Sequence, residues 1–144
     1  MLVVAFDQLT KHWAVTSLAD GHTVDVLPTV KFQLSYNSGM SFSTGADWGR
    51  VIAVVVAVIT IGLVVAIVRE TNTPRTLLFA LVVGGAIGNL IDRVVRGDGP
   101  FLSGQVVDFI NVTWFAVFNV ADACVVLGGI GLVLYELFPK RVIT

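Results

Sequence analysis

One uncharged run limits what this chain can fold into: residues 51–68 read VIAVVVAVITIGLVVAIV. A helix of this length, at about 1.5 Å per residue, crosses most of a hydrocarbon layer that is roughly 30 Å thick. The rest of the chain agrees, because 56% of its 144 residues are hydrophobic and only 13% are charged. Soluble domains carry roughly a quarter charged residues, so the sequence predicts a protein that resides in a lipid bilayer.

Three more helices are expected to cross the membrane. The polar connector RETNTPR follows the first run, and after it comes an apolar segment that contains Gly84 and Gly88. Small residues at this spacing let a neighbouring helix approach closely. The predicted fold is a membrane all-α bundle of four transmembrane helices, in a single domain that covers residues 1–144. Its helices are expected at about residues 2–19, 50–68, 75–95 and 116–138.

The N-terminal segment is expected to remain in the mature protein. It lacks a basic leading region, and Asp7 and Lys11 interrupt its apolar run, so it does not have the pattern of a cleavable signal peptide. These two residues have the i, i+4 spacing of an ion pair on one helix face. Residues 1–7 span only about 10 Å of helix, and we therefore expect the natural product to begin upstream of Met1.

Between the first two predicted helices, residues 30–36 alternate apolar and polar side chains, which is typical of a β-strand. The strand ends at the turn signature of residues 37–39, and Met40 and Phe42 resume the alternation. We expect a small extramembrane β-sheet within residues 22–47, lying against the helices. A surface hairpin without any role is the alternative that the spacing leaves open.

Several functions lack the residues that they need. A formal net charge of -1 gives no basic excess for binding nucleic acid, and the lone Cys124 cannot form an intrachain disulfide. His12 and His22 lie in different segments without further ligands at metal-binding spacing, so neither a metal nor a cofactor is expected. The chain also has no HExxH motif, no phosphate-binding glycine loop, and no Ser/Lys or Ser/His pair at the membrane face.

Four aspartates fall in or near the predicted spans, where an ionisable group is costly and therefore suggests a function. They are Asp7, Asp92, Asp108 and Asp122. For the first two a packing or hydrogen-bonding role is favoured, because each has a polar partner one helical turn away. The four-helix topology places Asp108 and Asp122 together at one membrane face.

Two carboxylates in a pocket of low dielectric share one proton and titrate as a unit, which is how an aspartic peptidase activates water. The residues alone also allow a small ion-coupled carrier or channel subunit with carboxylates along its pathway, or a purely structural subunit. Lysines and arginines are evenly distributed between the loops of the two sides, so charge counting does not orient the chain.

Five segments, read in order, resemble the motifs of bacterial lipoprotein signal peptidase, also called signal peptidase II. They are residues 7–11 (DQLTK), 37–42 (NSGMSF), 88–93 (GNLIDR), 106–109 (VVDF) and 118–122 (FNVAD). The resemblance implies an aspartic endopeptidase of the bacterial inner membrane that removes the signal peptide of a lipidated prolipoprotein, just before the diacylglyceryl-modified cysteine. It also implies an active site at the outer face, both termini in the cytoplasm, and contact with membrane lipid; we expect a monomer.

Position by position, the resemblance makes Asp108 and Asp122 the catalytic pair, with Asn119 orienting the second of them. The remaining motif residues would support the site or the substrate. Among them, Asp7 and Lys11 would brace the first helix, Asn37 and Gly39 would belong to the sheet that cradles the substrate, and Asn89, Asp92 and Arg93 would be polar residues around the site. The connection 94–107 looks longer than is usual in the family, which leaves its conformation over the site open.

Overall fold

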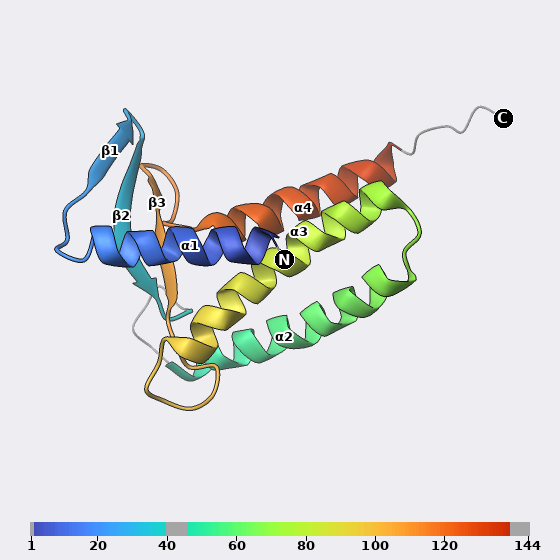
Figure 1. Cartoon of the computed structure of the whole chain (residues 1–144), viewed down its shortest axis with the longest axis horizontal. Coiled ribbons are helices and arrows are strands. Elements are labelled where there is room, and N and C mark those ends of the chain that lie inside the picture. Colours follow the sequence, from blue (N-terminus) through green and yellow to red (C-terminus); the bar gives the residue numbers. More distant parts are fainter. Residues whose placement is uncertain (1, 40–45, 139–144) are drawn as a thin grey trace.

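The computed structural model describes residues 2–39 and 46–138, and it contains four helices and three strands in this part of the chain. The helices are α1 (Leu2–Ser17), α2 (Ala46–Arg69), α3 (Thr73–Val95) and α4 (Val120–Leu137). The strands are β1 (Val24–Leu27), β2 (Val30–Asn37) and β3 (Val106–Val112). The helices run side by side, and the sheet lies across one end of them (Figure 1).

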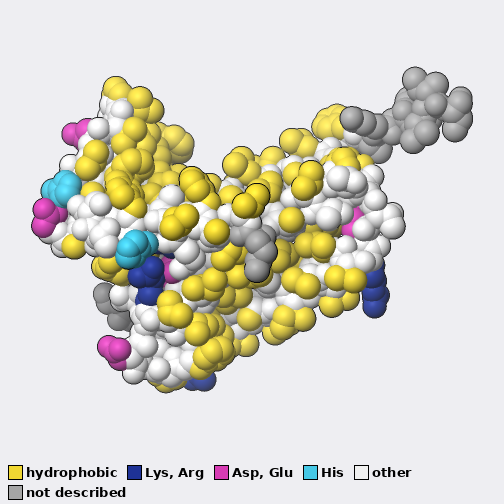
Figure 2. All heavy atoms as spheres, viewed as in Figure 1, with side chains coloured by type: hydrophobic (Ala, Val, Ile, Leu, Met, Phe, Trp, Pro, Cys, Tyr) yellow, Lys and Arg dark blue, Asp and Glu magenta, His cyan; other side chains and the backbone are white. Residues whose placement is uncertain are grey.

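Three of the helices, α2, α3 and α4, are long and apolar enough to cross a membrane. Their outward side chains are largely hydrophobic, and Figure 2 shows this apolar surface along the bundle. Such a surface is stable only where lipid replaces water. Of the four predicted transmembrane helices, three thus have the length and apolar composition that a span requires. Helix α1 has 16 residues and is not among the three.

Glycines let the helices approach closely at the centre of the bundle. A Cβ on Gly84 would lie 2.8 Å from Cβ of Val3, and one on Gly88 would lie 2.5 Å from Oδ2 of Asp7. Both glycines therefore face α1. Gly85 faces α4, because a Cβ there would overlap the carbonyl oxygen of Ala121. The predicted role of the Gly84–Gly88 spacing in close helix packing agrees with these contacts.

The predicted small sheet is present, but it is not confined to the segment between the first two helices. Strand β2 forms antiparallel pairs with β1 on one side and with β3 on the other. Strand β3 comes from the connection between α3 and α4, so the sheet joins two loops that are distant in sequence. The expected continuation of the alternation at Met40 and Phe42 lies outside the described residues.

The sheet packs on the C-terminal half of α1. Four buried residues form this core: Ala14, Leu18, Val107 and Phe109. The ring of Trp13 meets the ring of Phe32 edge-on at a centroid distance of 5.3 Å, and both rings contact Phe109. This packing fixes β3 against the helices and therefore sets the position of Asp108.

Candidate active site

Asp108 and Asp122 reach the same region from different elements. Asp108 lies in the middle of β3, and Asp122 lies in the first turn of α4. The chain reverses direction after β3 and returns alongside it, with hydrogen bonds between the backbones of Ile110 and Phe118 at 2.8 and 3.0 Å. This reversal brings the start of α4 next to Asp108. Because residues up to Phe118 take part in this reversal, α4 begins at Val120 and not near residue 116 as the sequence predicted.

Asn119 lies between the two aspartates and contacts both. It is the N-cap of α4: its Oδ1 accepts a hydrogen bond from the backbone N–H of Asp122 at 2.9 Å. In return, Oδ2 of Asp122 accepts from the backbone N–H of Asn119 at 3.2 Å, which completes a capping box. The Nδ2 of Asn119 donates to Oδ1 of Asp108 at 2.7 Å. One buried residue thus contacts both carboxylates, that of Asp108 through its side chain and that of Asp122 through its backbone N–H.

The carboxyl group of Asp108 is 2% exposed, and β2 supplies its second donor. Nδ2 of Asn37 donates to Oδ2 of Asp108 at 3.1 Å. Burial raises the pKa of Asp108 from 3.8 to about 6; the donors Asn37 and Asn119 lower this pKa, and the negative charge of Asp122 raises it.

A second set of polar residues lies behind the aspartates, between α1 and α3. Lys11 is fully buried and forms ion pairs with Asp7 at 2.9 Å and with Asp92 at 2.8 Å. Its ammonium also donates to Oδ1 of Asn89 at 2.8 Å. Asn89 in turn donates from Nδ2 to Oδ1 of Asp122 at 2.7 Å. The predicted pair of Asp7 and Lys11 is therefore part of a larger network that reaches the site.

Arg93 and Gly39 lie at the edge of the site. The guanidinium of Arg93 donates from one nitrogen to the carbonyl oxygens of Ser38 and Gly104, each at 3.0 Å. It therefore connects the end of β2 to the loop before β3. Gly39 has a φ of +99°, and a Cβ there would lie 2.9 Å from a guanidinium nitrogen of Arg93. Glycine is required at this position both by backbone conformation and by space.

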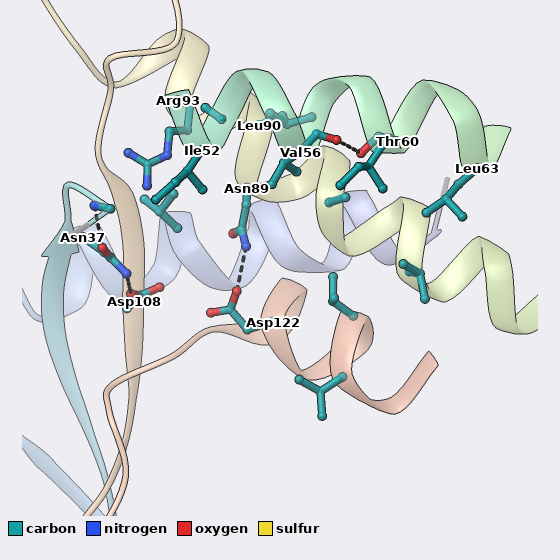
Figure 3. A pocket seen from close by; sticks show the side chains of 18 residues that line it. Asn37, Ile52, Val56, Thr60, Leu63, Asn89, Leu90, Arg93, Asp108 and Asp122 are labelled. Carbon is teal, nitrogen blue, oxygen red and sulfur yellow. Dashed lines mark hydrogen bonds between the residues drawn. The ribbon is translucent and has the colours of Figure 1, made fainter. Parts of the chain in front are cut away.

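The aspartates lie at one end of a long groove of about 540 Å³ (Figure 3). Helix α2 forms one wall, α4 forms the other, and α3 lies between them. Apolar side chains line most of its length, and apart from Thr60 on α2 the polar residues are at the end near the sheet. These polar residues are Asn37, Asn89, Arg93, Asp108 and Asp122. The groove can therefore hold an extended or helical apolar segment with its end at the two carboxylates.

The structure brings all ten sequence-predicted site residues into this one region. Those behind the groove are Asp7, Lys11, Asp92 and Asn119. Sequence reasoning missed Gln8, which donates to Oδ1 of Asp92 at 3.2 Å, and Arg96, whose Nε donates to the same oxygen at 2.9 Å. Arg96 is the C-cap residue of α3, four residues after Asp92, and this i, i+4 spacing was the available signal.

No group of three or more possible ligands among histidine, cysteine, aspartate and glutamate forms a metal site within the described ranges 2–39 and 46–138. The two carboxyl groups, which amides hold in place, can transfer protons.

The chain is similar in sequence and in fold to known proteins. A family model described as signal peptidase (SPase) II matches residues 1–138. The lipoprotein signal peptidase of Bifidobacterium adolescentis is 43% identical over 132 residues, which cover 91% of this chain and 70% of that protein. That of Mycolicibacterium smegmatis is 41% identical over 138 residues, covering 95% of this chain and 58% of that protein. The fold also matches a bacterial membrane enzyme solved by the in meso method at 1.9 Å resolution, with a TM-score of 0.82, 29% identity, and coverage of 96% and 90% of the two chains.

Proposed function

This chain belongs to the signal peptidase II family, and on that premise we propose that Asp108 and Asp122 are the catalytic pair of an aspartic endopeptidase. It is a membrane hydrolase that removes signal peptides from prolipoproteins, as its relatives' name states. The observation that carries the proposed mechanism is the convergence of two carboxyl groups, from β3 and from α4, at one end of an apolar groove.

The two carboxyl groups have different roles in the reaction. Asp108 carries the shared proton, since it is deeply buried and burial raises its pKa to about 6. Asp122 removes a proton from water as the water oxygen attacks the peptide carbonyl carbon, and Asp108 gives its proton to the carbonyl oxygen. The tetrahedral intermediate then collapses: Asp108 takes back a hydroxyl proton, the C–N bond breaks, and the leaving nitrogen receives the proton held by Asp122, which restores the starting state of both carboxyl groups.

The groove accounts for the shape of the substrate. A signal peptide has an apolar segment of 7–15 residues or so followed by small residues at its cleavage site. We place the apolar segment against α2 and α4, with the cleavage site beside the carboxyl groups. Ile52 and Val56 of α2 and Val125 of α4 are among the residues that would contact it.

Lipidation of the substrate sets the depth of the scissile bond. An apolar helix can slide along a groove in a membrane, whereas buried acyl chains contribute about 0.8 kcal/mol per CH₂ and hold the modified cysteine at the interface. The bond that precedes this cysteine would then lie level with the carboxyl groups at the sheet end of the groove. Cleavage just before the lipidated cysteine follows from this placement.

For the membrane arrangement, we propose that α1 is the fourth helix of the bundle in the inner membrane of a bacterium. The active site and the sheet would face outward, and both termini would face the cytoplasm. The partners of the protein would be lipidated prolipoproteins and the surrounding lipid, and it would act as a monomer.

The test is cleavage by the purified protein of one precursor prepared with and without the diacylglyceryl group. We expect the lipidated precursor to be cut, with a product that begins at the modified cysteine, and the unlipidated one to remain intact. EDTA should leave the rate unchanged, because two carboxyl groups suffice for this reaction. Equal cleavage of both precursors, or a loss in EDTA that a divalent metal restores, would contradict the proposal.

A further inference from the structure

The amide group of Asn89 has a fixed orientation. Its Oδ1 accepts two hydrogen bonds, from Nζ of Lys11 at 2.8 Å and from Nδ2 of Asn119 at 3.1 Å. Its Nδ2 donates to Oδ1 of Asp122 at 2.7 Å. Rotating the amide by half a turn would place its NH₂ group against the ammonium of Lys11 and its oxygen against the carboxylate of Asp122. Both new contacts would be repulsive, so only the observed orientation is stable.

Lys11 is held as firmly as the amide that it orients. An ammonium group has three N–H donors, and here they have three acceptors: Asp7, Asp92 and Asn89. The side chains of Lys11, Asp7 and Asp92 are each 0% exposed. The two carboxylates are also anchored, because Asp7 accepts from the backbone N–H of Ala121 at 3.0 Å and Asp92 accepts from that of Val107 at 3.2 Å.

We infer that Lys11 is a positioning residue for catalysis, which acts through Asn89 to hold the carboxylate of Asp122 in its working orientation. The inference deepens the proposed function and rests on it, since it gives Lys11 a role only if Asp122 is catalytic. It also goes beyond bracing of the first helix. The ammonium lies two hydrogen bonds away from the reacting carboxylate and does not touch the groove.

The first part of the test separates positioning from binding. In Lys11→Met, kcat should fall by about 100-fold, as expected when a reacting group is misplaced by about 1 Å, while the Kd for a lipidated precursor stays the same. Lys31→Met is the matched control, because it removes the same kind of side chain from β2, where Lys31 pairs with Asn111 and does not line the groove. This control should keep the parental kcat. A parental kcat in Lys11→Met, or an equal loss in Lys31→Met, would overturn the inference.

The second part tests whether the effect passes through Asn89. Asn89→Asp keeps the size of the side chain and the acceptor for Lys11, but it replaces the donor to Asp122 with a carboxylate oxygen. It should lower kcat as strongly as Asn89→Leu does. Adding Lys11→Met to Asn89→Leu should cause no further loss, since residues in one chain of contacts are not additive. The inference would be overturned if the losses of kcat in the two single variants multiplied in Lys11→Met/Asn89→Leu, or if Asn89→Asp were fully active.

Removing Lys11 alone leaves two buried carboxylates without their cation, so the variant could fail to fold. The double variant Lys11→Met/Asp7→Asn keeps the formal charge and retains an acceptor for the N–H of Ala121, and it should show the same loss of kcat. Asp122→Asn distinguishes a failure of this inference from a failure of the proposed function. If Asp122→Asn is inactive while the folded Lys11 variants are fully active, only this inference fails; if Asp122→Asn is active, the proposed function fails.

Discussion

The carboxyl group of Asp108 combines deep burial with two amide donors, and these have opposite effects on its pKa. Burial is the larger effect and raises the pKa from 3.8 to about 6, while the hydrogen bonds from Asn37 and Asn119 lower it. The proposed reaction needs one proton on the pair, so the active form is lost as the pH rises through this pKa. The pH dependence of cleavage therefore reports directly on Asp108.

We predict that Asn37→Leu moves the alkaline limb of the kcat/KM profile to higher pH. The substitution removes a donor that lowers the pKa of Asp108, and a hydrogen bond to a charged group corresponds to about one pH unit. Asn111→Leu is the control, because Asn111 also lies in the sheet but donates to Gln33 instead. If the alkaline limb of the kcat/KM profile does not move in Asn37→Leu, or moves equally in Asn37→Leu and Asn111→Leu, Asp108 is not the group that titrates.

Single residues also show how far sequence alone can go. The spacing of Asp7 and Lys11 predicted their ion pair, and the ten residues that the motifs singled out lie in one region of the structure. The contacts of Lys11 with Asp92 and Asn89 could not be predicted, because they depend on how α1 packs against α3. Asn119 both caps α4 and donates to Asp108. This could not be predicted either, because it depends on the return of the chain alongside β3.

At the level of elements, three helices form the groove: α2 and α4 are its walls, and α3 lies between them. Sequence periodicity predicted that these helices exist, because each contains a long apolar stretch. It did not predict the third strand, since the short apolar run in β3 is equally consistent with a strand or with a buried helix segment. The pairing of β3 with β2 is a contact between residues some 70 positions apart, such as Ser35 and Asp108.

A groove that binds the apolar part of the signal peptide should be blocked by a larger side chain on its wall. We predict that Val126→Trp on α4 raises KM for the lipidated precursor by about tenfold and changes kcat much less, because it removes binding space but not the carboxyl groups. Leu127→Trp is the matched control: it is the next residue of α4, it is also exposed, and it does not line the groove. Equal KM values for the two variants would contradict binding in the groove.

For the whole molecule, the sheet and the loop before β3 lie at one end, and the α2–α3 connection lies at the other (Figure 1). Asp108 in β3 and Asp122 in the first turn of α4 belong to the sheet end. Hydropathy predicted that the chain spans a membrane, but balanced loop charges could not orient it. The residues alone also left open an ion-coupled carrier, and membership of the signal peptidase II family decides this question in favour of a peptidase. The orientation is part of the proposal, and it can be tested in cells.

We predict that Phe101→Cys in a Cys124→Ala background reacts with a membrane-impermeant thiol reagent added to intact cells. Phe101 is 69% exposed in the loop at the sheet end, which we place on the outer side. Thr71→Cys, in the connection between α2 and α3, should react only after the membrane is permeabilised. The reverse pattern of labelling would place the active site in the cytoplasm and contradict the proposed orientation.

The central claim is that Asp108 and Asp122 together perform the cleavage. Its most direct test is the single-turnover rate of cleavage of a lipidated precursor by Asp108→Asn and by Asp122→Asn, each shown to be folded and to bind the precursor with the parental Kd. Each variant should lose at least about 1,000-fold in rate, because each removes one of two proton transfers that act together. If either variant binds normally and keeps more than a few per cent of the parental rate, catalysis lies elsewhere and the claim is wrong.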